Sequence, residues 1–210
     1  MNAPAALVLS LTAVVAVLDW LAVGTERRAL EYVLKPLVMV GLVVTALTLD
    51  TPDDAVRVAV VVALVLSLAG DVFLMVPRDL FVAGLASFLA AHVAYVVAMV
   101  VLGAAGGGLL VGLVLVGLAI AVLGVRILQG ARAADPALVG PVALYLAVIS
   151  IMVAAAAGTG MVVVVLGAVS FYVSDAVLGW TRFVTPFRHS RVVVMATYHV
   201  GQALLVVGLL

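Results

Sequence analysis

The chain contains no cysteine, which excludes a disulfide framework and any thiol chemistry. Charged residues are also scarce: they make up 10% of the 210 residues, whereas soluble domains carry about 25%. The charges cancel to a net charge of zero at pH 7, so no basic excess indicates a nucleic-acid partner. These absences argue against a soluble domain and leave the class to the hydrophobic residues, which are 68% of the chain.

Long apolar runs indicate an integral membrane protein, because a helix needs about 20 mostly apolar residues to cross a bilayer. We expect an all-α, polytopic fold with eight transmembrane helices. Glycine-rich turns at 103–108 and 158–160 divide two runs that are too long for one span. The first helix is expected to be an uncleaved span rather than a signal peptide. The expected spans are 5–23, 32–49, 55–76, 80–102, 109–128, 137–157, 161–180 and 192–210.

Basic residues predict the orientation, because cytoplasmic loops of membrane proteins carry an excess of Lys and Arg. Nine of the ten basic residues lie in or beside the loops that follow the odd-numbered spans, and Arg57 alone lies on the other side. We therefore expect these loops in the cytoplasm and both termini outside it. An arginine-rich, Ala/Val/Gly-rich chain favours a bacterial cytoplasmic membrane. The nine are Arg27, Arg28, Lys35, Arg78, Arg126, Arg132, Arg182, Arg188 and Arg191.

The two halves of the chain carry similar marker residues at similar spacing. An aspartate follows a proline by 35 residues in the first half and 34 in the second, and a histidine follows it by 56 and 58. We expect one transmembrane domain over 1–210, with possible parallel four-helix repeats over 1–103 and 104–210. The markers are Pro36, Asp71 and His92, then Pro141, Asp175 and His199.

Two carboxylates and two imidazoles inside apolar spans are the strongest functional signal. Charged groups in hydrocarbon are costly and usually mark a functional site. Asp71, His92, Asp175 and His199 all fall in the cytoplasmic half of the predicted bundle, so we expect them to converge on one cavity open to that side. The alternatives are structural ion pairs for the aspartates and hydrogen-bonded structural roles for the histidines.

Other polar residues accompany these four. Tyr95 follows His92 by three residues and Gln202 follows His199 by three, a spacing that places each pair on one helix face. They could orient an acid or base, or simply hold helices together. Lys35 and Asp19 lie near helix ends, where the alternatives are snorkelling for the lysine and solvation for the aspartate.

Several short motifs, taken in order, resemble the YhhN family of lysoplasmalogenase-like membrane proteins. The resemblance covers nearly the whole chain and includes the eight-helix plan. It implies hydrolysis of the vinyl ether bond of lysoplasmalogens, which yields a fatty aldehyde and a glycerophospho-ethanolamine or -choline. The motifs are Lys35-Pro36, Gly70-Asp71, Ser87-Phe88 with His92 and Tyr95, Ser174-Asp175, and Tyr198-His199 with Gln202.

A vinyl ether is hydrolysed by protonation at carbon, addition of water and collapse of the hemiacetal. This calls for one carboxylic acid that donates a proton and a second group that activates water. We expect Asp71 and Asp175 to form this pair in either assignment, with His92 and His199 orienting water or a carboxylate. Lys35 is expected to hold the lipid phosphate, and the further substrate contacts are expected from Tyr95, Ser174, Tyr198 and Gln202.

Two other functions remain open from the residues alone. Two histidines and two aspartates could bind Zn²⁺ with an open position for water, although we expect no cofactor. Parallel repeats with central acids also suit a proton-coupled transporter. A transporter needs a path to the outer side, and the outer halves of most predicted helices consist mainly of Ala, Val, Leu and Gly. We therefore expect a hydrolase with a lysophospholipid substrate.

Overall fold

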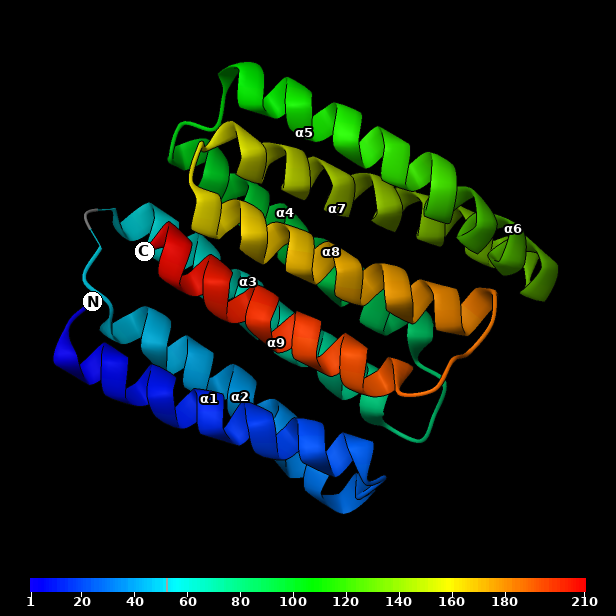
Figure 1. The fold of residues 1–210 in the computed structure, drawn as a ribbon, viewed down its shortest axis with the longest axis horizontal. Coiled ribbons are helices and arrows are strands. Elements are labelled where there is room, and N and C mark those ends of the chain that lie inside the picture. Colours follow the sequence, from blue (N-terminus) through cyan, green and yellow to red (C-terminus); the bar gives the residue numbers. More distant parts are fainter. Residues whose placement is uncertain (52) are drawn as a thin grey trace.

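A computed structural model describes residues 1–51 and 53–210, and this part of the chain folds into an antiparallel helical bundle (Figure 1). Eight segments are long and apolar enough to cross a membrane, which confirms the predicted all-α fold. The fifth segment joins α5, η1 and α6, and the sixth joins η2 and α7. The elements are α1 (Ala3–Gly24), α2 (Arg28–Thr48), α3 (Asp54–Met75), α4 (Phe81–Val101), α5 (Gly106–Ala119), the π-helical η1 (Ile120–Gly124), α6 (Val125–Ala134), the 3₁₀ turn η2 (Pro136–Leu138), α7 (Val139–Gly158), α8 (Val162–Phe183) and α9 (Ser190–Leu209).

The helices lie side by side, with α1 at one edge of the bundle and the α5–α6 span at the other (Figure 1). Both termini lie at the same end, as an even number of spans requires. The pairs α3–α4 and α8–α9 pack most closely. At the α8–α9 crossing, a Cβ on Gly167 would lie 2.9 Å from the Leu205 nitrogen, and one on Gly201 would lie 2.8 Å from the Phe171 nitrogen. The two backbones therefore touch at these glycines.

Glycine and capping residues set the ends of the helices. Gly103 and Gly160 have φ angles of +85° and +70°, a left-handed conformation that suits glycine. These positions are the two glycine-rich turns expected from the sequence. At the start of α1, the Asn2 side chain accepts a hydrogen bond from the Ala5 N–H at 3.0 Å, and at the start of α3 the Asp53 carboxylate accepts one from Ala55 at 2.8 Å.

Two helices begin or end outside the expected bounds. α2 begins at Arg28 rather than at 32, so Pro36 lies inside the helix instead of opening it. Since proline has no N–H, the carbonyl of Tyr32 receives no helical hydrogen bond there. The α5–α6 span continues to Ala134 and includes Arg126 and Arg132. Polar residues at a membrane surface extend a helix past the apolar run, which hydropathy alone does not reveal.

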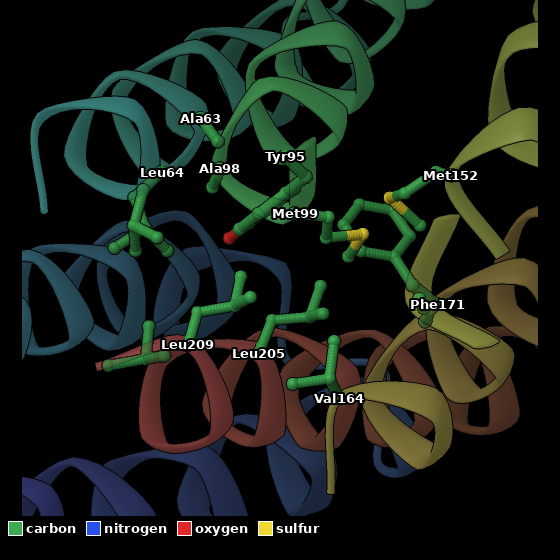
Figure 2. Packing of buried hydrophobic residues seen from close by; sticks show 14 of the residues in the cluster. Ala63, Leu64, Tyr95, Ala98, Met99, Met152, Val164, Phe171, Leu205 and Leu209 are labelled. Atoms are coloured by element: carbon green, nitrogen blue, oxygen red, sulfur yellow. The ribbon is translucent and has the colours of Figure 1, made fainter. Parts of the chain in front are cut away.

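The main apolar core fills the middle of the bundle and its half nearer the termini. Figure 2 shows its side chains converging from α3, α4, α7, α8 and α9, with Phe171 and Met99 packed at the centre. Tyr95, Phe171, Met99 and Leu205 have no exposed surface. The opposite half of the bundle, around the loops α3–α4 and α8–α9, holds the buried charged residues Asp19, Glu31, Lys35 and Asp71.

Candidate active site

A cavity with charged walls lies in that opposite half, between α2, α3, α8 and α9. We call it the polar cavity. Its empty space is about 820 Å³ including the open mouth. Both aspartates expected from the sequence line it, together with Tyr198 and Ser174. Its charged residues are Arg28, Glu31, Lys35, Asp71, Asp175 and Arg191.

Asp71 is paired with a cation and almost fully buried. Its Oδ1 lies 2.8 Å from the Lys35 Nζ, and its Oδ2 accepts a hydrogen bond from the Tyr198 hydroxyl at 2.8 Å. Side-chain exposure is 1% for Asp71 and 5% for Lys35. Two donors, one of them charged, thus contact the two carboxyl oxygens of Asp71. Because Lys35 is paired with Asp71, the other basic residues that line the cavity are the ones available at its mouth.

Asp175 has a different environment. The Tyr145 hydroxyl donates to its Oδ2 at 2.6 Å, and the Nε2 of His92 lies 3.6 Å from the same oxygen. His92 is fully buried against the rings of Tyr145 and Phe171, and neither of its ring nitrogens has a hydrogen-bond partner in the described residues. Among residues 1–51 and 53–210, no Lys or Arg side-chain nitrogen lies within 4.0 Å of the Asp175 carboxylate. Asp175 is therefore the aspartate without a fixed cation.

A second cavity shares four lining residues with the first, Asp175 among them. We call it the apolar cavity: it lies between α4, α6, α7 and α8, and its empty space, including the open mouth, is about 570 Å³. Its walls are mostly aliphatic and aromatic, and they include Phe81, Ile127 and Leu146. The residues common to both cavities are Leu74, Phe88, Asp175 and Leu178. A charged compartment and a hydrocarbon compartment thus share one carboxylate.

His199 does not join the two aspartates. Its Nδ1 accepts a hydrogen bond from the Trp20 indole N–H at 3.1 Å, and its ring lines a separate cavity between α1, α2 and α9. The expectation that all four residues converge on one cavity therefore needs correction. His92 reaches Asp175, but in α9 the residue that reaches Asp71 is Tyr198, one position earlier.

Two expected substrate contacts also lie elsewhere. The Tyr95 hydroxyl donates to the Gln202 side-chain oxygen, and both residues are buried without lining either cavity. They tie α4 to α9, which is the structural alternative raised by their spacing. Ser174 lines the polar cavity, but its hydroxyl donates to the Val194 carbonyl at 3.0 Å and so ties α8 to α9.

The four residues that could bind zinc do not lie together in the described part of the chain. Within residues 1–51 and 53–210, no three His, Asp or Glu side chains come together as possible ligands. Asp71 is bound to a lysine and His199 to a tryptophan. The two histidines and two aspartates therefore do not form the four-residue site that their number allowed.

The sequence interpretation missed several residues of the site. Tyr145, the hydrogen-bond donor to Asp175, was not predicted as a site residue, because a tyrosine in a membrane helix does not by itself indicate a site. Glu31 was missed because α2 was expected to begin after it, although its spacing of four from Lys35 places both on one face. Asp19 was expected to be solvated, yet it is fully buried and its oxygens have no partner among the described residues.

Comparisons with known proteins show the family of this chain. The sequence model of the YhhN family matches residues 30–209. The human protein Lysoplasmalogenase TMEM86B is 34% identical over 152 residues, which cover 70% of this chain and 62% of the human protein. The chain thus spans less than two thirds of that relative's length. No solved structure gives a significant match. On the extent of the family match, this chain is a member of the YhhN family.

Proposed function

We propose that this protein is an intramembrane hydrolase that cleaves the vinyl ether bond of lysoplasmalogen-type lysolipids. The products are a fatty aldehyde and a glycerophospho-base. Membership of the YhhN family supports this proposal, as does the name of the human relative, a lysoplasmalogenase. The single observation that carries it is the junction of the polar and apolar cavities at Asp175.

A lysoplasmalogen has one hydrocarbon chain, and its vinyl ether joins that chain to the glycerol of the headgroup. With the headgroup in the polar cavity and the chain in the apolar cavity, the vinyl ether lies beside the residue that both cavities share. Among the shared residues Asp175 alone can exchange a proton, since Leu74, Phe88 and Leu178 cannot. The junction therefore favours Asp175 as the general acid.

The reaction follows from this placement. Protonated Asp175 donates its proton to the β-carbon of the vinyl ether, and the ether oxygen shares the resulting positive charge. Water adds to the α-carbon and gives up a proton to a base. The hemiacetal hydroxyl then loses its proton and becomes the aldehyde carbonyl as the bond to the glycerol oxygen breaks, and the glycerol oxygen takes up that proton and leaves as an alcohol. Asp175 returns to its protonated form with the proton that the water released.

Asp71 is the group best suited to receive that proton, because Lys35 and Tyr198 hold it as a carboxylate facing the same cavity. Its negative charge also stabilises the cation formed when the vinyl ether is protonated. Tyr145 orients Asp175 through its hydrogen bond, and the neutral ring of His92 packs behind it. This scheme uses no cofactor.

The apolar core supports a hydrolase over a transporter. Both cavities that contain Asp175 are lined from the ends of the helices away from the termini. The other half is filled by buried side chains such as Met99, Val164 and Leu205 (Figure 2). A one-sided site is sufficient for hydrolysis, whereas transport needs alternating access from both sides.

The test is product analysis with purified protein in detergent or nanodiscs. Three lysolipids that differ in the bond to the chain are compared: a vinyl ether, an ester and a saturated ether. We expect fatty aldehyde from the vinyl ether alone, and none from Asp175→Asn. Fatty acid release from the ester would make the protein a lysophospholipase, and the absence of any product from all three would refute hydrolysis.

A further inference from the structure

We propose that Arg191 and Arg28 form a binding site for the phosphate of a lipid headgroup at the mouth of the polar cavity, and that Glu31 positions Arg191. The inference extends the proposed function, because it names the residues that would hold the substrate's polar end. It replaces Lys35, which the sequence indicated for this role and which is paired with Asp71.

Arg191 is held in place by Glu31 through only one of its three guanidinium nitrogens. A single nitrogen, Nη2, donates to both carboxylate oxygens of Glu31, at 2.7 and 2.6 Å. The Nε and Nη1 groups have no hydrogen-bond acceptor among the described residues, although a guanidinium carries five N–H donors in all. Glu31 is 8% exposed, whereas Arg191 is 42% exposed. A buried carboxylate thus fixes an arginine whose other donors remain available.

The charges at the mouth favour an anion. Arg28 also lines the polar cavity, is exposed, and makes no side-chain hydrogen bond or ion pair within the described residues. Deeper in the cavity, the charges of Lys35 and Asp71 offset each other. At the mouth, Arg28 and Arg191 outnumber Glu31 by one charge. Arginine is well suited to phosphate because its planar N–H groups match the phosphate oxygens.

The position along α9 suits a glycerophospholipid. Arg191 and Tyr198 are seven residues apart, which is about 10 Å along a helix. Tyr198 contacts Asp71 at the depth of the aspartates. The arginine side chain and a glycerol phosphate together span that distance, so a phosphate held at Arg191 leaves the vinyl ether near Asp175. The phosphate site therefore also sets the depth of the scissile bond.

The chain supplies a matched control. Arg182 donates to Asp79 at 2.7 Å through its Nη2 and is 40% exposed, close to the 42% of Arg191. It lies at the same end of the bundle but lines neither cavity. Arg182→Gln therefore removes another arginine–carboxylate pair at the same end of the bundle without touching the proposed phosphate site.

The experiment measures binding rather than turnover. A saturated-ether lysophospholipid, which lacks the vinyl bond, is titrated against the purified protein, and an alkylglycerol of the same chain length without phosphate serves as the second ligand. We expect Arg191→Gln to weaken binding of the phospholipid by about 10- to 100-fold, the range for a hydrogen bond to a charged group. Binding of the alkylglycerol should not change, and Arg182→Gln should change neither.

Further arms separate the possible failures. If Arg191→Gln does not fold, the double variant Glu31→Gln/Arg191→Gln replaces the ion pair by two amides and should show the same selective loss. Inorganic phosphate should compete poorly; competition at the affinity of the lipid would overturn a lipid site. Equal weakening of both ligands, or of neither, would also refute it. If wild type hydrolyses no lysolipid but shows the arginine-dependent binding, the proposed activity fails and the phosphate site stands.

Discussion

The polar and apolar cavities share Asp175, yet their walls have opposite character. Helices α2, α3, α8 and α9 line most of the polar cavity, and α4, α7 and α8 line most of the apolar cavity. α2 contributes Arg28, Glu31 and Lys35, whereas α7 contributes Val142, Tyr145, Leu146 and Ile149. Helix α2 thus brings charge to one cavity, and α7 brings mostly hydrocarbon to the other.

The side chains next to the two aspartates also differ in charge, although they come from comparable positions in the chain. Each has one neighbour from the second span of its own half and one from the last span of the other half. The first set is Asp71, Lys35 and Tyr198, and the second is Asp175, Tyr145 and His92. This exchange between halves supports our proposal of parallel four-helix repeats. Replacing an ammonium by a phenol is enough to give two like groups different roles.

Membrane orientation gives the largest, all-or-none test. If both cavities open to the cytoplasm, as the distribution of basic residues predicts, a reporter fused after Leu210 should report an extracytoplasmic location. A reporter inserted between Phe183 and Ser190 should report a cytoplasmic one. A cytoplasmic C-terminus would place both cavities on the outer side and reverse the predicted topology.

Asp175→Asn should have the largest effect on chemistry. Asparagine can still accept a hydrogen bond from Tyr145, but it cannot donate a proton to carbon. We expect kcat for a vinyl-ether lysolipid to fall by about 10²- to 10⁴-fold, with little change in thermal stability. Steady-state kinetics and a melting curve check both parts. A folded variant with full turnover would remove Asp175 from the mechanism.

Asp71→Asn should differ by destabilising the protein, because it leaves Lys35 buried without its partner. Breaking a buried ion pair costs about 3–5 kcal/mol. The double variant Lys35→Met/Asp71→Asn removes both charges and should recover much of that stability. Denaturation of Asp71→Asn, Lys35→Met, the double variant and wild type measures the coupling. If Asp71→Asn alone is as stable as wild type, the ion pair does not distinguish the two aspartates.

Gly179→Val tests the apolar cavity. Gly179 lines it, and an added Cβ would lie 3.3 Å from the Ile127 side chain. We expect kcat/KM to fall for long-chain lysolipids and to fall less for short-chain ones. Each methylene that the valine excludes from the cavity costs about 0.8 kcal/mol of binding, which is about fourfold in kcat/KM. Gly140→Val is the control, because a Cβ there meets nothing within 4 Å. An equal loss at every chain length would contradict a chain-binding role.

The smallest effect concerns the exposed pair Asp79–Arg182. The hydrogen bond from Arg182 lowers the pKa of the Asp79 carboxyl below its usual 3.8, and the Phe81 N–H adds to this. A carboxyl whose pKa is lower in the folded protein stabilises the fold at pH values above its unfolded-state pKa. This stabilisation is lost as the pH falls through the folded-state pKa. Asp79→Asn should therefore lower the melting temperature slightly at neutral pH, and the difference should vanish well below pH 3.8. Glu31→Gln should cost more at neutral pH, because Glu31 is 8% exposed and Asp79 is 66% exposed.

Hydropathy and turn residues predicted the eight spans and both glycine turns, because these depend on local composition. Contacts between distant helices could not be predicted in this way. Glu31 and Arg191 are 160 residues apart, and no periodicity relates them. His199 shows the limit of spacing arguments, because successive residues of a helix point about 100° apart. Tyr198 therefore contacts Asp71, whereas the next residue, His199, points toward Trp20.

Backbone atoms of α8 and α9 meet at Gly167 and Gly201, where no side chain is present to change rotamer and let the helices slide. We therefore expect α8 and α9 to move together, with Asp175 and Tyr198 at a nearly constant separation. On the α2 side of the polar cavity, by contrast, long side chains such as Arg191 bridge the gap. We therefore expect the contact between α2 and α9 to give way first when the cavity opens.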